Sequence, residues 1–225
     1  MSGVVERAPL GLLGGTFDPV HYGHLRLADD VQNALALSEV RLVPAGDPPH
    51  RGEPRASAVD RLAMLDLACQ EFPGLTIDPR EIRRAGKSYT VLTLEELRVE
   101  DPGRPLLWII GADSLLGLPQ WHRWRELFEL AHLIVAERPG VTLEAALPQA
   151  LAAEWNARLV LDPADLRQRP FGAIYRQRVA PQSISASAIR AAIARGAAST
   201  ARGLLPDGVL AYIEHNGLYR AHPHS

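Results

Sequence analysis

Short apolar runs alternate with longer stretches of mixed apolar and polar residues along this chain. Two of the runs, Leu106–Ile110 and Leu133–Ala136, contain no polar residue at alternate positions. Such runs are typical of strands in a parallel sheet that is buried on both faces. We predict seven strands, at Leu10–Gly14, Val40–Pro44, Leu75–Asp78, Leu106–Ile110, Leu133–Ala136, Arg158–Leu161 and Ala173–Val179.

The stretches between the strands predict helices at Tyr22–Ala36, Ala58–Phe72, Thr90–Glu100, Trp124–Leu130 and Leu143–Glu154. Strands that alternate with helices favour an α/β fold with a doubly wound, mainly parallel sheet (Rossmann-like), whose ligand lies beyond the carboxyl ends of the strands. A small helical C-terminal segment follows from about Ser185, with one break near Gly203–Pro206. We therefore expect one domain over residues 1–225.

The composition narrows the class of protein. The 225 residues are 47% hydrophobic and carry a formal net charge of −2, so we expect a full core and no nucleic-acid partner. Cys69 is the single cysteine, which excludes an internal disulfide, and its apolar surroundings predict a buried small hydrophobe. No apolar stretch reaches the ~18 residues of a membrane span, and no basic segment followed by an apolar run begins the chain. We expect a cytoplasmic protein without a membrane partner.

The segment Gly14–His24, GGTFDPVHYGH, combines a strand end, glycines and two histidines. Glycines let backbone N–H groups approach an anion, and a helix N-terminus adds about half a positive charge. His21 and His24 can face one ligand, because residues three apart share a helical face. The pattern favours a phosphate site. A metal site is a poor alternative, because two histidines lack a third ligand, and a pair of core histidines is the other alternative.

This segment resembles the signature of the nucleotidyltransferase superfamily that carries an HxGH motif, which His21–His24 fills. The resemblance implies transfer of a nucleotide from a triphosphate to a phosphate, with release of pyrophosphate. It implies that His21 and His24 are the catalytic residues. The ATP contacts that it implies in this segment are Gly14, Gly15, Thr16, Phe17, His21 and His24.

A second candidate phosphate element is the segment ISASAIR, Ile184–Arg190. Ser185 and Ser187 are candidate N-caps of the helix that follows, and Arg190 can reach an anion at the helix start. From composition alone, an ordinary capped helix with a solvated arginine is the alternative. The segment resembles the second signature of the same superfamily, ISxTxIR, which implies that Ile184, Ser185, Ser187 and Arg190 bind ATP.

Gly111 and Asp113 follow the predicted strand Leu106–Ile110. In a parallel sheet this position faces the ligand crevice, where a carboxylate can accept hydrogen bonds from ribose hydroxyls. An N-cap role for Asp113 is the alternative. The sequence IIGADSL resembles a nucleotide-holding IIGxDSL sequence of similar enzymes, which implies that Gly111 and Asp113 bind ATP.

Trp121, Trp124 and Phe128 share a helical spacing that is more typical of a core than of a ligand platform. Relatives with a W-x-x-W/Y sequence stack the first tryptophan on a pyridine ring. This resemblance assigns Trp121 to the ligand and leaves Trp124 in the core. His122 stands where relatives often have tyrosine.

Two further segments carry polar groups that can reach a ligand. Pro48–Arg51 lies in the loop Ala45–Arg55, which is rich in proline and glycine, and Ser88-Tyr89-Thr90 precedes a predicted helix. Long loops are often binding loops, and a helix start can bind a carboxylate. A solvated loop and a plain cap are the alternatives.

Taken in order, these motifs resemble the family of bacterial nicotinate mononucleotide adenylyltransferases. The resemblance implies that ATP and nicotinate mononucleotide react to give nicotinate adenine dinucleotide and pyrophosphate, with Mg²⁺ on the ATP and no protein metal site. Another acceptor, such as nicotinamide mononucleotide, and a non-catalytic nucleotide-binding module remain the alternatives, and a homo-oligomer stays open. The implied mononucleotide contacts are Thr16, His50, Arg51, Ser88, Tyr89, Thr90, Asp113 and Trp121.

Overall fold

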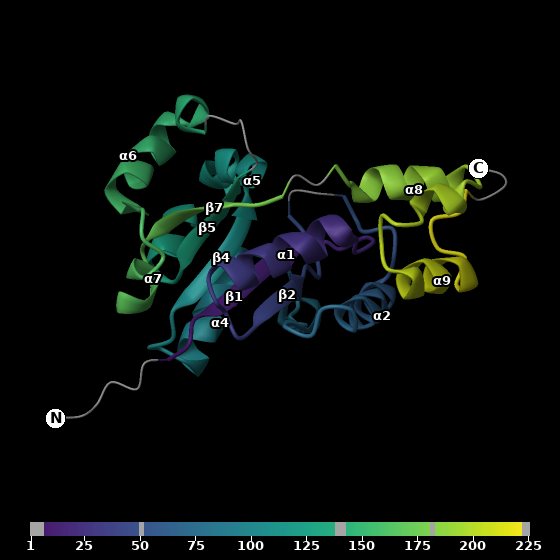
Figure 1. Cartoon of the computed structure of the whole chain (residues 1–225), viewed down its shortest axis with the longest axis horizontal. Coiled ribbons are helices and arrows are strands. Elements are labelled where there is room, and N and C mark those ends of the chain that lie inside the picture. The colour runs from purple at the N-terminus through teal and green to yellow at the C-terminus, as the bar shows by residue number, and fades with distance from the viewer. Residues whose placement is uncertain (1–6, 50–51, 138–142, 181–182, 222–225) are drawn as a thin grey trace.

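The centre of the molecule is a seven-stranded sheet in which every paired strand runs parallel to its neighbour (Figure 1). The computed structural model describes residues 7–49, 52–137, 143–180 and 183–221. The strands are β1 (Leu10–Gly15), β2 (Val40–Pro44), β3 (Leu75–Ile77), β4 (Leu106–Gly111), β5 (His132–Glu137), β6 (Leu159–Val160) and β7 (Ile174–Arg178). The predicted doubly wound, Rossmann-like sheet is confirmed, and it is wholly rather than mainly parallel.

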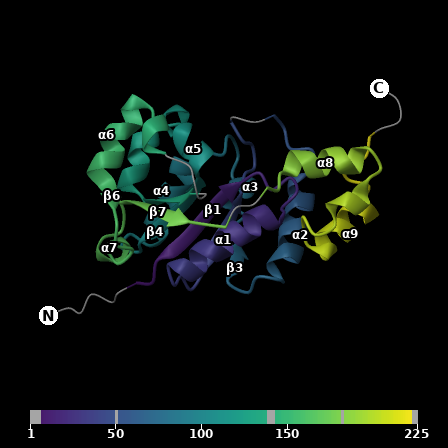
Figure 2. The ribbon, with the colours of Figure 1, turned by 45° about the horizontal axis from the view of Figure 1, so that its top comes forward.

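Helices connect the strands and cover both faces of the sheet (Figures 1 and 2). The α-helices are α1 (Tyr22–Ala34), α2 (Ala58–Cys69), α3 (Arg80–Arg83), α4 (Thr90–Glu100), α5 (Ala112–Leu116), α6 (Gln149–Arg158), α7 (Asp165–Gln168), α8 (Ala186–Ala194) and α9 (Asp207–His215). Short 3₁₀ helices are η1 (Leu118–Gln120), η2 (Trp124–Glu129), η3 (Glu144–Ala146) and η4 (Ala198–Ala201).

Side chains along the strands alternate between two apolar clusters, one on each face of the sheet. In β4, Leu107 and Ile109 belong to the cluster that includes α1, α2, α8 and α9. Leu106, Trp108 and Ile110 belong to the other cluster, with α4, η2 and α6. Because both faces are covered, the strands need no polar face, which explains their continuous apolar runs.

The strand order β3-β2-β1-β4-β5-β7-β6 reverses direction between β1 and β4. The chain moves outward from β1 through β2 to β3, and then returns to pair β4 with the other side of β1. In open parallel sheets such a reversal opens a crevice at the carboxyl ends of the two strands. Here those ends are Gly15 and Gly111, which lead toward α1 and into α5.

Of the C-terminal helices, α9 packs beside α2 and α8 packs against η4 (Figure 1). The Tyr212 hydroxyl of α9 donates to Asp60 Oδ1 of α2 at 3.0 Å. The backbone N–H of Tyr22, the first residue of α1, donates to Leu204 O at 3.0 Å. These contacts fix the C-terminal helices against the helices that follow β1 and β2.

Several predicted boundaries differ from the structure. The predicted helix Leu143–Glu154 is interrupted at Pro148, which has no N–H and becomes the N-cap of α6. The predicted helix Trp124–Leu130 is the 3₁₀ helix η2. The helices α3 and α7 have four residues each, too few to give a periodic signal. Cys69, the last residue of α2, is half-buried rather than buried.

Among the described residues, no helix is both long enough and apolar enough to cross a membrane.

Trp124 belongs to the core, as predicted. Trp124 is 7% exposed, and its ring packs edge-on against the Phe128 ring, with centroids 6.2 Å apart. We expect Trp124→Ala to lower the free energy of unfolding by about 3–5 kcal/mol, because the loss leaves a large cavity. Urea unfolding measures this, with Trp124→Phe as the milder control. A loss for Trp124→Ala no larger than for Trp124→Phe would contradict the core assignment.

Candidate functional site

The carboxyl end of β1 is packed so closely that its two glycines leave little or no room for a side chain. A Cβ on Gly14 would lie 2.7 Å from the Trp108 ring, and one on Gly15 would lie 3.0 Å from the Phe17 ring. Phe17 is buried although its φ is +50°, a conformation that is uncommon for a bulky residue. The aromatic rings therefore set the path of the backbone where β1 gives way to α1.

His21 and His24 stand together at the start of α1. His21 is the N-cap residue, and its ring stacks on that of His24 with centroids 3.8 Å apart and planes 19° from parallel. The Phe17 ring meets His24 edge-on at 5.0 Å. A Cβ on Gly23 would lie 2.9 Å from the His21 ring. The HxGH spacing thus produces one compact imidazole pair, which needs glycine between the histidines.

Burial keeps His21 neutral. The residue is 5% exposed, and desolvation lowers the pKa of its imidazole to about 4. Its buried Nδ1 has no hydrogen-bond partner among the described residues. Buried polar atoms usually have partners, so this nitrogen is suited to a ligand. Within the described ranges, no three His, Cys, Asp or Glu side chains are placed to hold a metal ion.

The second signature lies against the first. The Ile184 carbonyl oxygen is 3.5 Å from the position of a Cβ on Gly23. Ser185 is the N-cap of α8, where its Oγ accepts from Ala188 N at 3.1 Å. Arg190 Nη2 donates to Ser187 Oγ at 3.3 Å. The structure therefore brings the HxGH turn and the start of α8 into one region.

Asp18 is the residue that joins these segments, and the sequence analysis did not identify it. Its buried carboxylate accepts from Arg55 N at 2.7 Å, Ala56 N at 3.1 Å and the Tyr219 hydroxyl at 2.7 Å. Arg190 Nη1 donates to the Asp18 carbonyl oxygen at 2.6 Å and lies 4.0 Å from Asp18 Oδ2. One side chain thus ties the signature turn to the residues before α2, to α8 and to the chain end.

Arg61 is a second residue that the sequence analysis missed. It is 1% exposed, and its Nη1 donates to Thr16 O at 2.9 Å and to Ala45 O at 2.6 Å. Desolvation lowers the pKa of the guanidinium, an effect that nearby Asp18 opposes. The available signal was its position on the apolar face of α2, shared with Met64 and Leu65.

Ser88 holds the loop after β2. Its Oγ accepts from Gly46 N at 2.8 Å and from Asp47 N at 3.2 Å, and its N–H donates to Asp47 O at 2.9 Å. Ala45 N in turn donates to Gly15 O at 2.9 Å. Hydrogen bonds through the loop residues therefore connect Ser88 with Gly15 at the end of β1.

Tyr89 faces the predicted tryptophan segment. Its ring lies 4.4 Å from the His122 ring, between centroids, and both Tyr89 and Trp121 pack half-buried against the same apolar cluster. The N–H groups of Ser88 and Tyr89 donate within the chain. Thr90 and Val91 begin α4, so their N–H groups have no helical acceptor and face outward from the helix start.

Gly111 and Asp113 lie at the carboxyl end of β4. Gly111, rather than Asp113, is the N-cap of α5, so the N-cap alternative for Asp113 is wrong. Asp113 is exposed in the first turn, and a Cβ on Gly111 would meet nothing within 4 Å. This end of β4 is open. His50 and Arg51, two predicted mononucleotide contacts, lie outside the described residues.

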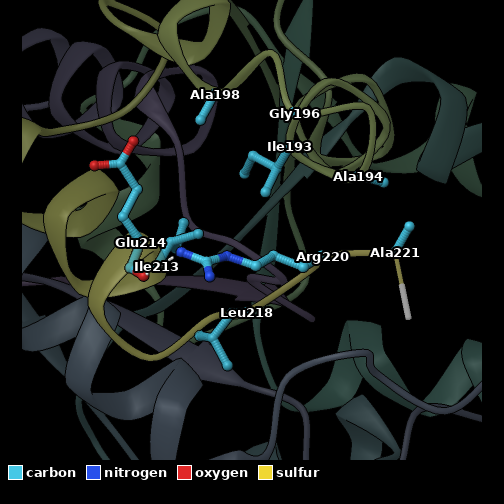
Figure 3. A pocket seen from close by; sticks show the side chains of 9 residues that line it. All are labelled: Ile193, Ala194, Gly196, Ala198, Ile213, Glu214, Leu218, Arg220 and Ala221. Carbon is cyan, nitrogen blue, oxygen red and sulfur yellow. Dashed lines mark hydrogen bonds between the residues drawn. The ribbon is translucent and has the colours of Figure 1, made fainter. Parts of the chain in front are cut away.

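Two cavities lie on the C-terminal helices. A cavity of about 200 Å³ is lined by Arg55, Ser187, Arg190 and Tyr219, with two alanines of α8. A larger one of about 510 Å³ lies between α8 and α9, where Arg220 Nη2 donates to Glu214 O at 2.9 Å (Figure 3). None of the predicted site residues lines the larger cavity, whereas the smaller one adjoins the second signature.

Comparison with known proteins finds relatives that match nearly the whole chain. The sequence profile of the cytidylyltransferase-like family matches residues 12–192. A "Probable nicotinate-nucleotide adenylyltransferase" from Halorhodospira halophila is 50% identical over 210 residues, 93% of this chain and 94% of its own. One of the same name from Laribacter hongkongensis is 51% identical over 219 residues, 97% of each chain.

The fold is similar to that of a solved structure, "Plasmodium falciparum nicotinic acid mononucleotide adenylyltransferase complexed with NaAD". The TM-score is 0.72, over 95% of this chain and 98% of that chain, at 16% sequence identity. At that identity the likeness concerns the fold.

The buried neutral His21 predicts a loss of stability in acid. The unfolded chain binds a proton near pH 6.5, whereas folded His21 binds it near pH 4, so stability falls as the pH falls through this window. His21→Asn removes the titration and supplies a good N-cap. We expect it to reduce the drop in unfolding free energy between pH 7 and pH 4 by up to about 3 kcal/mol.

Urea unfolding at both pH values measures this difference. His132, whose pKa burial also lowers to about 4, contributes equally in both proteins and so cancels. An identical drop in the wild type and in His21→Asn would show that His21 is not held neutral.

Proposed function

The chain belongs to the cytidylyltransferase-like family, and we propose that it is a nicotinate-nucleotide adenylyltransferase that joins ATP and nicotinate mononucleotide. The products are nicotinate adenine dinucleotide and pyrophosphate, in the biosynthesis of NAD. Relatives that share half of its residues over nearly their full length carry that name. We infer that the chain acts as one nucleotidyltransferase domain, because α9 packs on α2 and both C-terminal helices share an apolar cluster with α1 and the sheet.

The observation that carries the proposal is the meeting of two anion-binding elements. The imidazole pair at the start of α1 and the hydroxyls and guanidinium at the start of α8 are joined through Asp18 and Gly23. Two helix N-termini with these side chains suit a polyphosphate better than a single phosphate. A triphosphate that lies across both elements is therefore the ligand that the geometry supports best.

The acceptor needs little chemical activation. Its 5′-phosphate has a second pKa of about 6, so it is a dianion at pH 7 and attacks the ATP α-phosphorus directly. The bond between the α-phosphorus and the bridging oxygen of the β-phosphate breaks as the new P–O bond forms, and pyrophosphate leaves. Catalysis then consists of positioning and charge stabilisation.

We assign His21 and His24 to the α-phosphate, with backbone support from Gly14, Gly15, Thr16 and Phe17. A neutral imidazole offers one N–H donor, and a bound triphosphate favours the protonated form, which offers two. The stacked rings restrict each other, so the donors are held ready before the transition state forms. Arg61 fixes the Thr16 carbonyl in the same turn.

We propose that the second signature, Ile184–Arg190, binds the departing phosphates. We assign the β and γ phosphates to Ser185, Ser187, Arg190 and the backbone at Ile184. Arg190 donates from Nη1 to the Asp18 carbonyl oxygen and from Nη2 to Ser187 Oγ. Its remaining N–H groups can donate to an anion. We infer that Mg²⁺ enters with ATP as part of the substrate, bound mainly by phosphate oxygens and water.

The nicotinate end lies between the start of α4 and the turn before η2. We assign the pyridine ring to Trp121 and Tyr89, with His122 packed on Tyr89. We assign the nicotinate carboxylate to the N–H groups of Thr90 and Val91 at the start of α4, where the helix dipole favours an anion. Ser88 orders this segment rather than offering a free hydroxyl, because its Oγ already holds Gly46 and Asp47.

The remaining assignments concern the sugars and the loop after β2. Asp113 is exposed beside the open end at Gly111, where it can accept hydrogen bonds from ribose hydroxyls. His50 and Arg51 stay proposed contacts of the mononucleotide.

The substrate assignment predicts a strong preference for the acid over the amide. Backbone N–H donors pair with both oxygens of a carboxylate but oppose the NH₂ of an amide. With Mg²⁺ and saturating ATP, we expect kcat/KM for nicotinate mononucleotide to exceed that for nicotinamide mononucleotide by at least ~10²-fold. Pyrophosphate release with a panel of phosphate esters measures this. Turnover with another ester, and none with nicotinate mononucleotide, would contradict the proposal.

We predict that His24 contributes to kcat rather than to binding of the mononucleotide. We expect His24→Ala to lower kcat by ~10²–10³-fold, as removal of one preorganised donor does, with little change in KM for the mononucleotide. His215→Ala, at an exposed position of α9, is the matched control. Thermal unfolding of each variant separates catalysis from stability. Near-normal turnover by a folded His24→Ala protein would remove this histidine from the mechanism.

A further inference from the structure

Tyr219 approaches the site from the far end of the chain. Its hydroxyl donates to Asp18 Oδ1 at 2.7 Å, across 201 positions of sequence. Its backbone has a φ of +62°, which is uncommon for a residue with a side chain, and its ring lines the 200 Å³ cavity with Ser187 and Arg190. The chain end is thus held in a defined place beside the second signature.

The Asp18 carboxylate has about four lone-pair positions, and protein donors occupy three of them. The backbone N–H of Arg55 donates to Oδ2, whereas the backbone N–H of Ala56 and the Tyr219 hydroxyl both donate to Oδ1. Burial and the neighbouring carboxylate raise the pKa of Tyr219 well above its usual range. The hydroxyl therefore keeps its proton and remains a donor at neutral pH.

Arg190 is the charged donor best placed to fill a vacant position on that carboxylate. Its Nη1 is 4.0 Å from Asp18 Oδ2, beyond hydrogen-bond range, and donates to the Asp18 carbonyl oxygen instead. Arg61 faces the same carboxylate but commits its Nη1 to Thr16 O and Ala45 O. If the Tyr219 hydroxyl were absent, the buried carboxylate would lose one of its three donors and would attract the Arg190 guanidinium more strongly, which favours a short ion pair at Oδ2.

We propose that Tyr219 is a positioning residue for Arg190: by donating to Asp18 Oδ1, its hydroxyl satisfies part of the carboxylate's charge and so weakens the attraction that would draw the Arg190 guanidinium away from the departing phosphates. The inference rests on the proposed function for the identity of the reaction. Tyr219 touches no reacting atom and acts through Asp18. Loss of its hydroxyl lets Asp18 draw the guanidinium away from Ser187 and the triphosphate.

Tyr219→Phe tests this with the smallest possible change. We expect kcat/KM for ATP to fall about tenfold or more, the loss typical of a hydrogen bond to a charged group, while KM for nicotinate mononucleotide stays unchanged. Tyr212→Phe is the matched control, because its hydroxyl also ties a C-terminal residue to an aspartate, Asp60, at 3.0 Å. It should leave both kinetic constants unchanged and alter only stability.

A double-mutant cycle with Arg190→Ala identifies the route of the effect. If Tyr219 acts through Arg190, then Tyr219→Phe should produce no further loss in the Arg190→Ala background. A full additional loss there would overturn the proposal, as would wild-type kinetics in Tyr219→Phe or equal losses toward both substrates.

Calorimetric titration with ATP gives the same comparison without an acceptor. We expect weaker ATP binding in Tyr219→Phe than in Tyr212→Phe, and equal binding would overturn the proposal. Failure of the wild type to use nicotinate mononucleotide would count against the proposed function alone, because ATP binding still tests the role of Tyr219.

Discussion

The buried carboxylate of Asp18 is the contact on which the rest of the site depends. A carboxylate removed from water is costly unless donors and nearby cations satisfy it, and here its donors come from the segment before α2 and from the chain end. Its own backbone oxygen receives Arg190. Satisfying this one group therefore requires that the signature turn, α2, α8 and the terminal segment all take their native places together.

The sheet provides the opening at which the signature turn lies. Reversal of the strand order between β1 and β4 leaves an opening at the carboxyl ends of both strands. Rings of Trp108, Phe17 and His21 fill the space beside Gly14, Gly15 and Gly23, so the backbone before α1 has little freedom. A rigid turn beside a sheet opening can present imidazoles and N–H groups without reorganisation, which is what charge stabilisation in phosphoryl chemistry requires.

Patterns that are local in sequence could be predicted, and contacts between distant residues could not. The apolar runs predicted the sheet, and the motifs Gly14–His24 and Ile184–Arg190 identified two segments that the structure brings together. Asp18 reads as part of a turn, and its partners lie as far as 201 positions away. Arg61 reads as a polar residue of α2, although its apolar-face position hinted at burial. Pro148 interrupted a helix that periodicity alone extended.

The central claim is that two helix starts, held together by Asp18, form a single polyphosphate site. A crystal structure with a non-hydrolysable ATP analogue tests it most directly. The account predicts that the triphosphate contacts His21 and His24 at one end and Ser187 and Arg190 at the other, with the hydrogen bonds of the Asp18 carboxylate unchanged. A triphosphate that contacts α1 but not α8, or that displaces Arg190 onto the Asp18 carboxylate, would contradict it.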